Sequence, residues 1–114
     1  MTEYSVIIQN QKYIIQLLEG RKTKSTIDRI LEDGLEILRV DDVSKGAGNN
    51  LQREVITYAV RQHTNTPLRY LAAIWGYSTE SSIYQIYSRA NDKALGKDEE
   101  FIILYNNLCV GLGI

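Results

Sequence analysis

Residues 51–95, LQREVITYAVRQHTNTPLRYLAAIWGYSTESSIYQIYSRANDKAL, decide the fold of this chain. Apolar and aromatic residues recur in this stretch at intervals of three and four, which is the spacing of one face of a helix. The runs are separated by Thr66-Pro67, which is typical of a helix start, and by Gly76, which is typical of a helix end. The stretch therefore predicts three consecutive helices, the last two forming a helix-turn-helix.

Each of these helices has an expected inner face. The first should bury one side made up of Leu51, Val55, Tyr58, Ala59 and Gln62. The second should begin with Thr66 as N-cap and Pro67 at the first helical position, and bury Leu68, Leu71, Ala72 and Trp75. The third should be capped by Ser78 or Thr79 and bury Ile83, Ile86, Tyr87, Ala90 and Ala94.

The stretch resembles the C-terminal DNA-binding domain (domain IV, a TrpR-like helix-turn-helix) of the bacterial replication initiator DnaA. That family has a helix of the form R-Q-x-A-x-Y-L-A-R-E-L-T, and residues 53–64 match it at Arg53, Tyr58, Arg61 and Thr64. The following pattern, S-L-x-E-I-G-x-A-F-G, is matched in part by residues 67–76. We therefore expect a stand-alone relative of this DNA-reading domain.

The signature of the family, G-R-D-H-[ST]-T-V, aligns without a gap to residues 77–83. The Asp-His pair that reads bases in the family is replaced here by Thr79-Glu80. Val40 to Lys45 resembles the short V-x-D-L-x-S-K element that precedes these helices, so the resemblance extends over most of the chain. It implies the fold and duplex DNA binding, in replication control or transcriptional regulation, but not the target sequence of the family.

Two sets of side chains are candidates for DNA contacts. Serine and glutamine near the start of a recognition helix suit base edges in the major groove, and basic residues suit phosphates. With the position that replaces the aspartate of the family included, the candidates for base contacts are Thr79, Ser81, Ser82 and Gln85. The candidates for phosphate contacts are Lys45, Arg53, Pro67, Arg69 and Arg89. Pro67 is included because it occupies the first position of the family's S-L-x-E pattern.

The charge of the chain is uneven. The whole chain has a formal net charge of −1, whereas residues 45–93 contain six basic and three acidic residues. A positive middle is what DNA binding requires. The loop at residues 44–50 keeps only Lys45, although the family has a basic loop here. The acidic balance, the depleted loop and the lost Asp-His pair favour the alternative function, a protein-interaction module that retains the fold without binding DNA.

Outside the central stretch, the pattern predicts further helices in an all-α fold of five or six. Residues 1–22 should form an additional N-terminal helix, over about residues 3–19, that covers the core or joins a homodimer. The domain proper should span residues 23–110, with a helix from Ser25 or Thr26 to about Leu38 and a last helix capped by Asp98. Residues 111–114 should form a frayed tail.

Little in the sequence suggests catalysis. His63 is the only histidine and Cys109 the only cysteine, so neither zinc spacing nor a nucleophile–base–orienter set is present. We expect His63 to be a partly buried core or cap residue and Cys109 to be a small buried one. We expect no enzyme activity, no cofactor and no small-molecule substrate. The single cysteine, the lack of a signal-peptide pattern and the lack of a membrane-spanning apolar run predict a cytoplasmic protein without membrane contact.

Overall fold

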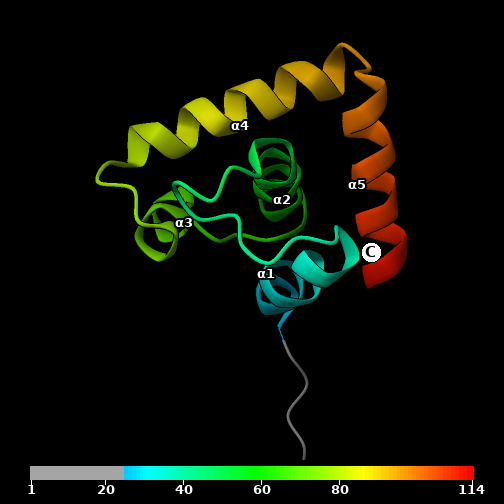
Figure 1. The fold of residues 1–114 in the computed structure, drawn as a ribbon, viewed down its shortest axis with the longest axis horizontal. Helices are drawn as coiled ribbons and strands as arrows, with labels where there is room; N and C mark the ends of the chain where they lie inside the picture. Colours follow the sequence, from blue (N-terminus) through cyan, green and yellow to red (C-terminus); the bar gives the residue numbers. More distant parts are fainter. Residues whose placement is uncertain (1–24) are drawn as a thin grey trace, which may run out of the picture.

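The computed structural model describes residues 25–114, and this part of the chain consists of five α-helices without strands (Figure 1). The predicted all-α class is therefore confirmed. The expected helix at residues 1–22, and any dimer formed through it, lie outside the described residues. In chain order the helices are α1 (Thr26–Ile37), α2 (Asn50–His63), α3 (Leu68–Trp75), α4 (Glu80–Leu95) and α5 (Glu99–Leu112).

Local signals place most of the helix ends. The hydroxyl of Ser25 accepts a bond from the amide of Asp28 at 3.3 Å, and the carboxylate of Asp98 accepts one from the amide of Phe101 at 3.0 Å. Asp98 is the predicted N-cap, and Ser25 is one of the two candidates for the other; each satisfies a helix-start amide that has no partner within its helix. At α3 the prediction is wrong by one residue, because Pro67 is the N-cap, in extended conformation, and the helix begins at Leu68.

Helix α2 lies at the centre and contacts the other four helices (Figure 1). Its five consecutive residues 53–57 are all buried, so this part of the helix is covered on every side. The expected one-sided face was therefore too narrow, and Gln62, which we assigned to it, is exposed. A central helix must bury every face of its middle turns, and apolar periodicity alone does not reveal this.

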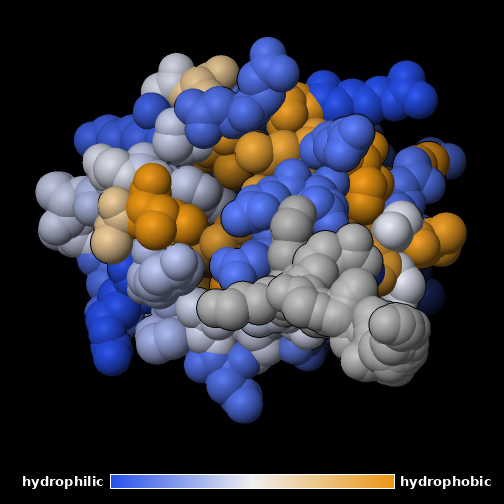
Figure 2. All heavy atoms as spheres, turned by 90° about the horizontal axis from the view of Figure 1, so that it is seen from below, coloured by the Kyte–Doolittle hydropathy of each residue, from blue (hydrophilic) through white to orange (hydrophobic). Residues whose placement is uncertain are grey.

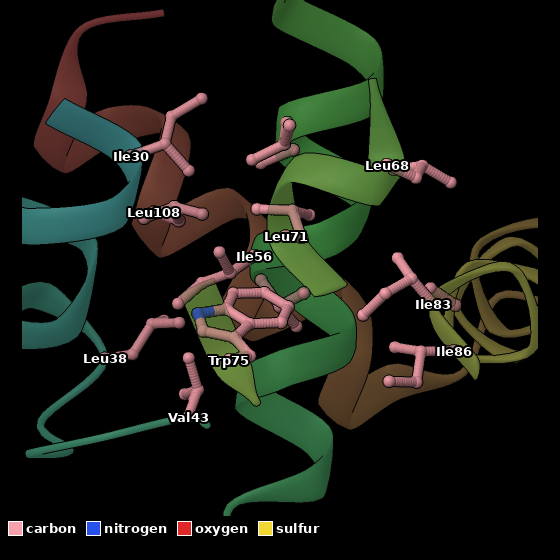
Figure 3. Packing of buried hydrophobic residues seen from close by; sticks show 14 of the residues in the cluster. Ile30, Leu38, Val43, Ile56, Leu68, Leu71, Trp75, Ile83, Ile86 and Leu108 are labelled. Atoms are coloured by element: carbon pink, nitrogen blue, oxygen red, sulfur yellow. The ribbon is translucent and has the colours of Figure 1, made fainter. Parts of the chain in front are cut away.

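The core forms where the other helices meet α2. Figure 3 shows Ile30 of α1 beside Leu108 of α5, and Ile83 and Ile86 of α4 directed toward the α2–α3 side. Trp75, at the end of α3, is 6% exposed. The predicted inner residues Leu68, Leu71, Ile83 and Ala90 are all buried. The apolar stripes of α3 and α4 are thus confirmed as the faces that fix these two helices on the domain.

The end of the chain packs against α1, the first helix of the described residues. Leu112 is 2% exposed and α5 continues to it, so the expected frayed tail is wrong for residues 111 and 112. Gly111 lies against Ile37, where an added Cβ would be 2.7 Å from the Cδ1 of that side chain. The guanidinium of Arg29 donates to the carbonyl of Leu112. Contacts with α1 therefore order the last turn of α5, which short-range sequence signals do not report.

Candidate nucleic-acid interface

A tight turn joins α3 to α4. Gly76 has φ of 82°, a left-handed conformation that glycine adopts at low cost. The amides of Gly76 and Tyr77 both donate to the carbonyl of Ala72 and close the end of α3. The chain then reaches Thr79, the N-cap of α4, in extended conformation. This unit fixes the start of α4 at one end of the molecule (Figure 1).

The polar side of α4 faces outward. Ser81 and Gln85 are exposed and Ser82 is half-buried, whereas Ile83 and Ile86 on the other side are buried. Two predicted base-reading residues, Ser81 and Gln85, are thus accessible along the first two turns. Gln85 can offer a donor and an acceptor to an adenine edge, and serine hydroxyls can serve as either.

Three hydroxyl groups gather at the start of α4. The Oγ1 atom of Thr79 lies 3.0 Å from the Oγ of Ser81 and 3.3 Å from the Oγ of Ser82. Thr79 occupies the N-cap position, but its side chain makes no capping bond to the backbone. The structure therefore brings three of the four predicted base-contacting residues together. Because hydroxyl groups rotate, the cluster can present either donors or acceptors.

The loop before α2 lies beside the turn that leads into α4. The amide of Lys45 donates to the carbonyl of Trp75 at 2.8 Å, which fastens the loop to the end of α3. The Nζ of Lys45 lies 6.0 Å from the ring centroid of Tyr77, and the side chain is exposed. A residue 34 positions before Thr79 in the sequence thus supplies a positive charge next to the start of α4.

Arg53 is not exposed beside Lys45 and the start of α4, where we expected it to contact phosphate. It is 5% exposed, and its guanidinium donates to the carbonyls of Val43 and Ser44 and to the side chain of Asn50. The prediction of a phosphate contact is wrong, because those donors are used within the protein. Arg53 instead holds the backbone just before Lys45, and it supports the loop from beneath.

The start of α3 carries two further predicted contacts, Pro67 and Arg69, which are both exposed. Pro67 has no amide proton, so it can donate nothing to a phosphate. Arg69 can donate, and the side chain borders an open apolar groove. The groove has a volume of about 580 Å³ and is lined by Ile27, Thr66, Pro67, Arg69, Tyr70 and Ala73. Arg69 therefore supplies an exposed basic side chain at the edge of this groove.

Arg89 is accessible but already has a partner. Its Nε lies 3.3 Å from one carboxylate oxygen of Glu54, and the Nζ of Lys93 lies 2.6 Å from the other. Glu54 is 4% exposed. Sequence reasoning missed this cluster because Glu54 lies on α2 and its partners follow 35 and 39 residues later. The only usable signal was the spacing of four between Arg89 and Lys93, which places both on one face of a helix.

A second polar group lies at the other end of α2. The Nε2 of His63 is 2.9 Å from the hydroxyl of Tyr105, and the Sγ of Cys109 is 4.0 Å from the same nitrogen. His63 is exposed rather than partly buried, and Cys109 is half-buried rather than fully buried. The pKa of Tyr105 is raised well above its usual value. The main cause is burial of its hydroxyl group, and a hydrogen bond between Tyr105 and Cys109 adds to the effect. Among the described residues, no three His, Cys, Asp or Glu side chains are placed to hold a metal ion.

In residues 25–114, none of the helices has the length and apolar character needed to cross a lipid bilayer. In comparisons with known proteins, no family model, no curated protein and no solved structure matches this chain.

Proposed function

We propose that this protein binds duplex DNA sequence-specifically, with the start of α4 in the major groove. The observation that carries the proposal is the outward polar face of α4, where Ser81 and Gln85 are accessible beside the three-hydroxyl cluster. Glutamine and serine have the hydrogen-bonding groups that read base edges. The resemblance to the DNA-reading domain of DnaA agrees with this role and adds replication control or transcriptional regulation as its setting.

Phosphate contacts would come from both sides of that helix start. Lys45 is exposed next to the turn, Arg69 is exposed at the start of α3, and Arg89 lies one turn after Gln85. A helix that lies in the major groove needs such contacts on the flanking backbone to fix its register. With Arg53 removed from the set, these three side chains are the positions that support the proposal.

Selection of bound sequences from a random duplex pool tests this function. The proposal expects one short motif to be enriched by the full-length protein at low salt. Gln85→Ala should bind with similar affinity to random duplex and lose preference at one position of the motif, since phosphate contacts carry non-specific binding. A pool that is unchanged after repeated rounds at micromolar protein would contradict the proposal.

A second candidate function, a protein-interaction module, is favoured by exposed apolar side chains on the opposite end of the molecule. Leu95 is 73% exposed, Ile103 52% and Val110 82%. Ile103 borders an open groove of about 670 Å³, which is lined by Ala94, Lys97, Glu99, Ile102 and Ile103. Figure 2, which views the molecule from below, shows apolar atoms at the right-hand edge, the side of α5 in Figure 1.

The two functions predict different effects of the same changes. Ile103→Asp and Val110→Asp should leave DNA binding unchanged if α4 is the working surface. If the protein works through protein contacts instead, these variants should abolish the contact while Gln85→Ala has no effect.

A further inference from the structure

We propose that the buried carboxylate of Glu54 stands in for a DNA phosphate in the unbound protein and sets how strongly α4 attracts duplex DNA. The inference rests on the proposed function, because it concerns phosphate contacts of the same helix. It is carried by three charged side chains between α2 and α4, which we call the Glu54 cluster: Glu54, Arg89 and Lys93.

The two cations of the Glu54 cluster are held unequally. Lys93 lies 2.6 Å from Oε1 of Glu54, and its side chain is 36% exposed. Arg89 lies 3.3 Å from Oε2 and its side chain is 57% exposed. Lys93 therefore makes the shorter and better-covered contact. Arg89 makes the longer contact, on the solvent side of the cluster.

The Glu54 cluster contains one more positive than negative charge. A buried carboxylate must keep at least one close cation, because an unpaired buried charge is strongly unfavourable. Lys93 meets that need, so Arg89 is the cation that Glu54 can release. The contact of Arg89 uses Nε alone. A phosphate could engage the guanidinium as a two-pronged donor, which is the geometry that arginine favours.

The position of Arg89 suits this exchange. It follows Gln85 by four residues, so the two side chains lie on one face of α4, and both are exposed. If Gln85 contacts a base, Arg89 lies one helical turn further along, toward the flanking backbone. Glu54 and a DNA phosphate therefore compete for the same guanidinium. The carboxylate lowers DNA affinity while it keeps the arginine ordered.

Three full-length variants test the exchange by the dependence of affinity for a random duplex on salt concentration. Glu54→Gln keeps the shape and an acceptor while it removes the competing charge. It should tighten binding at low salt roughly three- to tenfold and steepen the log–log salt slope by up to about 1, because the carboxylate no longer keeps Arg89 from the phosphate in part of the complexes. Glu100→Gln removes an equal charge from the exposed start of α5, and it should change affinity by less than about twofold because salt screens a distant charge.

Lys93→Arg provides a test that leaves net charge unchanged. An arginine at position 93 can bind both oxygens of Glu54 in a fork and release Arg89. The slope should again steepen, by up to about 1. If the Glu54 cluster only stabilises the fold, Lys93→Arg should change the stability measured by denaturation and leave the salt slope of DNA affinity unchanged. Because this variant retains all three charges, it carries the test even if Glu54→Gln fails to fold.

The outcomes separate this inference from the proposed function. If the wild type binds duplex DNA with a steep salt slope, and both Glu54→Gln and Lys93→Arg have that same slope, the role of Glu54 is overturned and DNA binding stands. If the wild type does not bind duplex DNA at low salt, both are overturned. Steeper slopes in both variants, with Glu100→Gln like the wild type, support the exchange.

Discussion

The guanidinium of Arg53 donates from Nη2 to the carbonyl of Ser44 at 2.7 Å and so joins the first turn of α2 to the loop that presents Lys45. The same loop is fastened on its other side by the bond from the amide of Lys45 to Trp75. An arginine that we expected to contact phosphate thus holds the loop of Lys45 from within the protein. This difference has consequences for both stability and binding.

Replacing Arg53 should destabilise the protein. Arg53→Met would leave the carbonyls of Val43 and Ser44 without their donor in a buried site, and the free energy of unfolding should fall by about 2–4 kcal/mol. Urea denaturation followed by circular dichroism measures this. Arg69→Met, an exposed arginine on α3, is the matched control and should change stability by no more than about 0.5 kcal/mol. Equal effects of the two changes would show that Arg53 does not hold the loop.

Asp42 should titrate below its ordinary pKa of 3.8, chiefly because the hydroxyl and the amide of Ser44 both donate to its carboxylate. Because the pKa is lower in the folded protein, the ionised carboxylate stabilises the fold at pH values above about 3.8. That contribution is lost as pH falls through the lower, folded-state pKa. A carbon-detected NMR titration of the carboxyl group checks the direction.

Ser44→Ala is the control for Asp42. It removes the hydroxyl donor, which is the largest cause of the shift, and should move the pKa of Asp42 back toward 3.8. No movement would mean that the hydroxyl does not contact the carboxylate in solution. Because this loop carries Lys45, Ser44→Ala should also weaken DNA binding modestly at neutral pH.

Gly111 should resist replacement even though it lies within a helix. Alanine normally stabilises a helix interior by about 1 kcal/mol relative to glycine. Here its Cβ would lie 2.7 Å from Cδ1 and 3.0 Å from Cγ1 of Ile37. Gly111→Ala should therefore lower the free energy of unfolding by about 1–3 kcal/mol because the contact is overpacked.

The background Ile37→Ala isolates that contact. With the isoleucine truncated, Gly111→Ala should become neutral or stabilising by up to about 1 kcal/mol, because the helix preference of alanine remains and the clash is gone. Denaturation of the four proteins completes a double-mutant cycle. If Gly111→Ala stabilises the wild type, the last turn of α5 does not pack on α1 as described.

Each basic side chain that contacts a phosphate should contribute separately to the salt dependence of DNA affinity. Lys45→Ala and Arg69→Ala should each reduce the log–log slope by about 1, and should weaken binding to all sequences about equally. The control is Lys97→Asn at the far end of α4, where φ is 57° and asparagine tolerates the left-handed conformation. A slope that falls as much in Lys97→Asn as in Lys45→Ala would mean that the phosphate contacts are spread over the whole surface.

A structural feature of this protein is predictable from the sequence when the residues that determine it lie close together along the chain. The caps at Ser25 and Asp98, the glycine turn at Gly76 and the inner faces of α3 and α4 depend on residues within a few positions of each other. All of them were predictable. The outward position of Gln85 follows from the same periodicity.

Features that depend on tertiary contacts were not predictable in the same way. Residues 53–57 are buried on all sides because four helices surround α2, and no periodicity encodes that. The burial of Arg53 and the pairing of Glu54 with Arg89 and Lys93 follow from that central position. The order of the last turn of α5 depends on Ile37, a residue 74 positions earlier.

An NMR titration of the labelled protein with random-sequence duplex DNA at low salt tests directly whether the start of α4 binds DNA. If it does, amide shifts should concentrate at residues 44–48 and 76–85, together with the side-chain amide of Gln85 and the Nε of Arg69 and Arg89. A spectrum that does not change, or shifts confined to residues 102–110 of α5, would contradict DNA binding through α4.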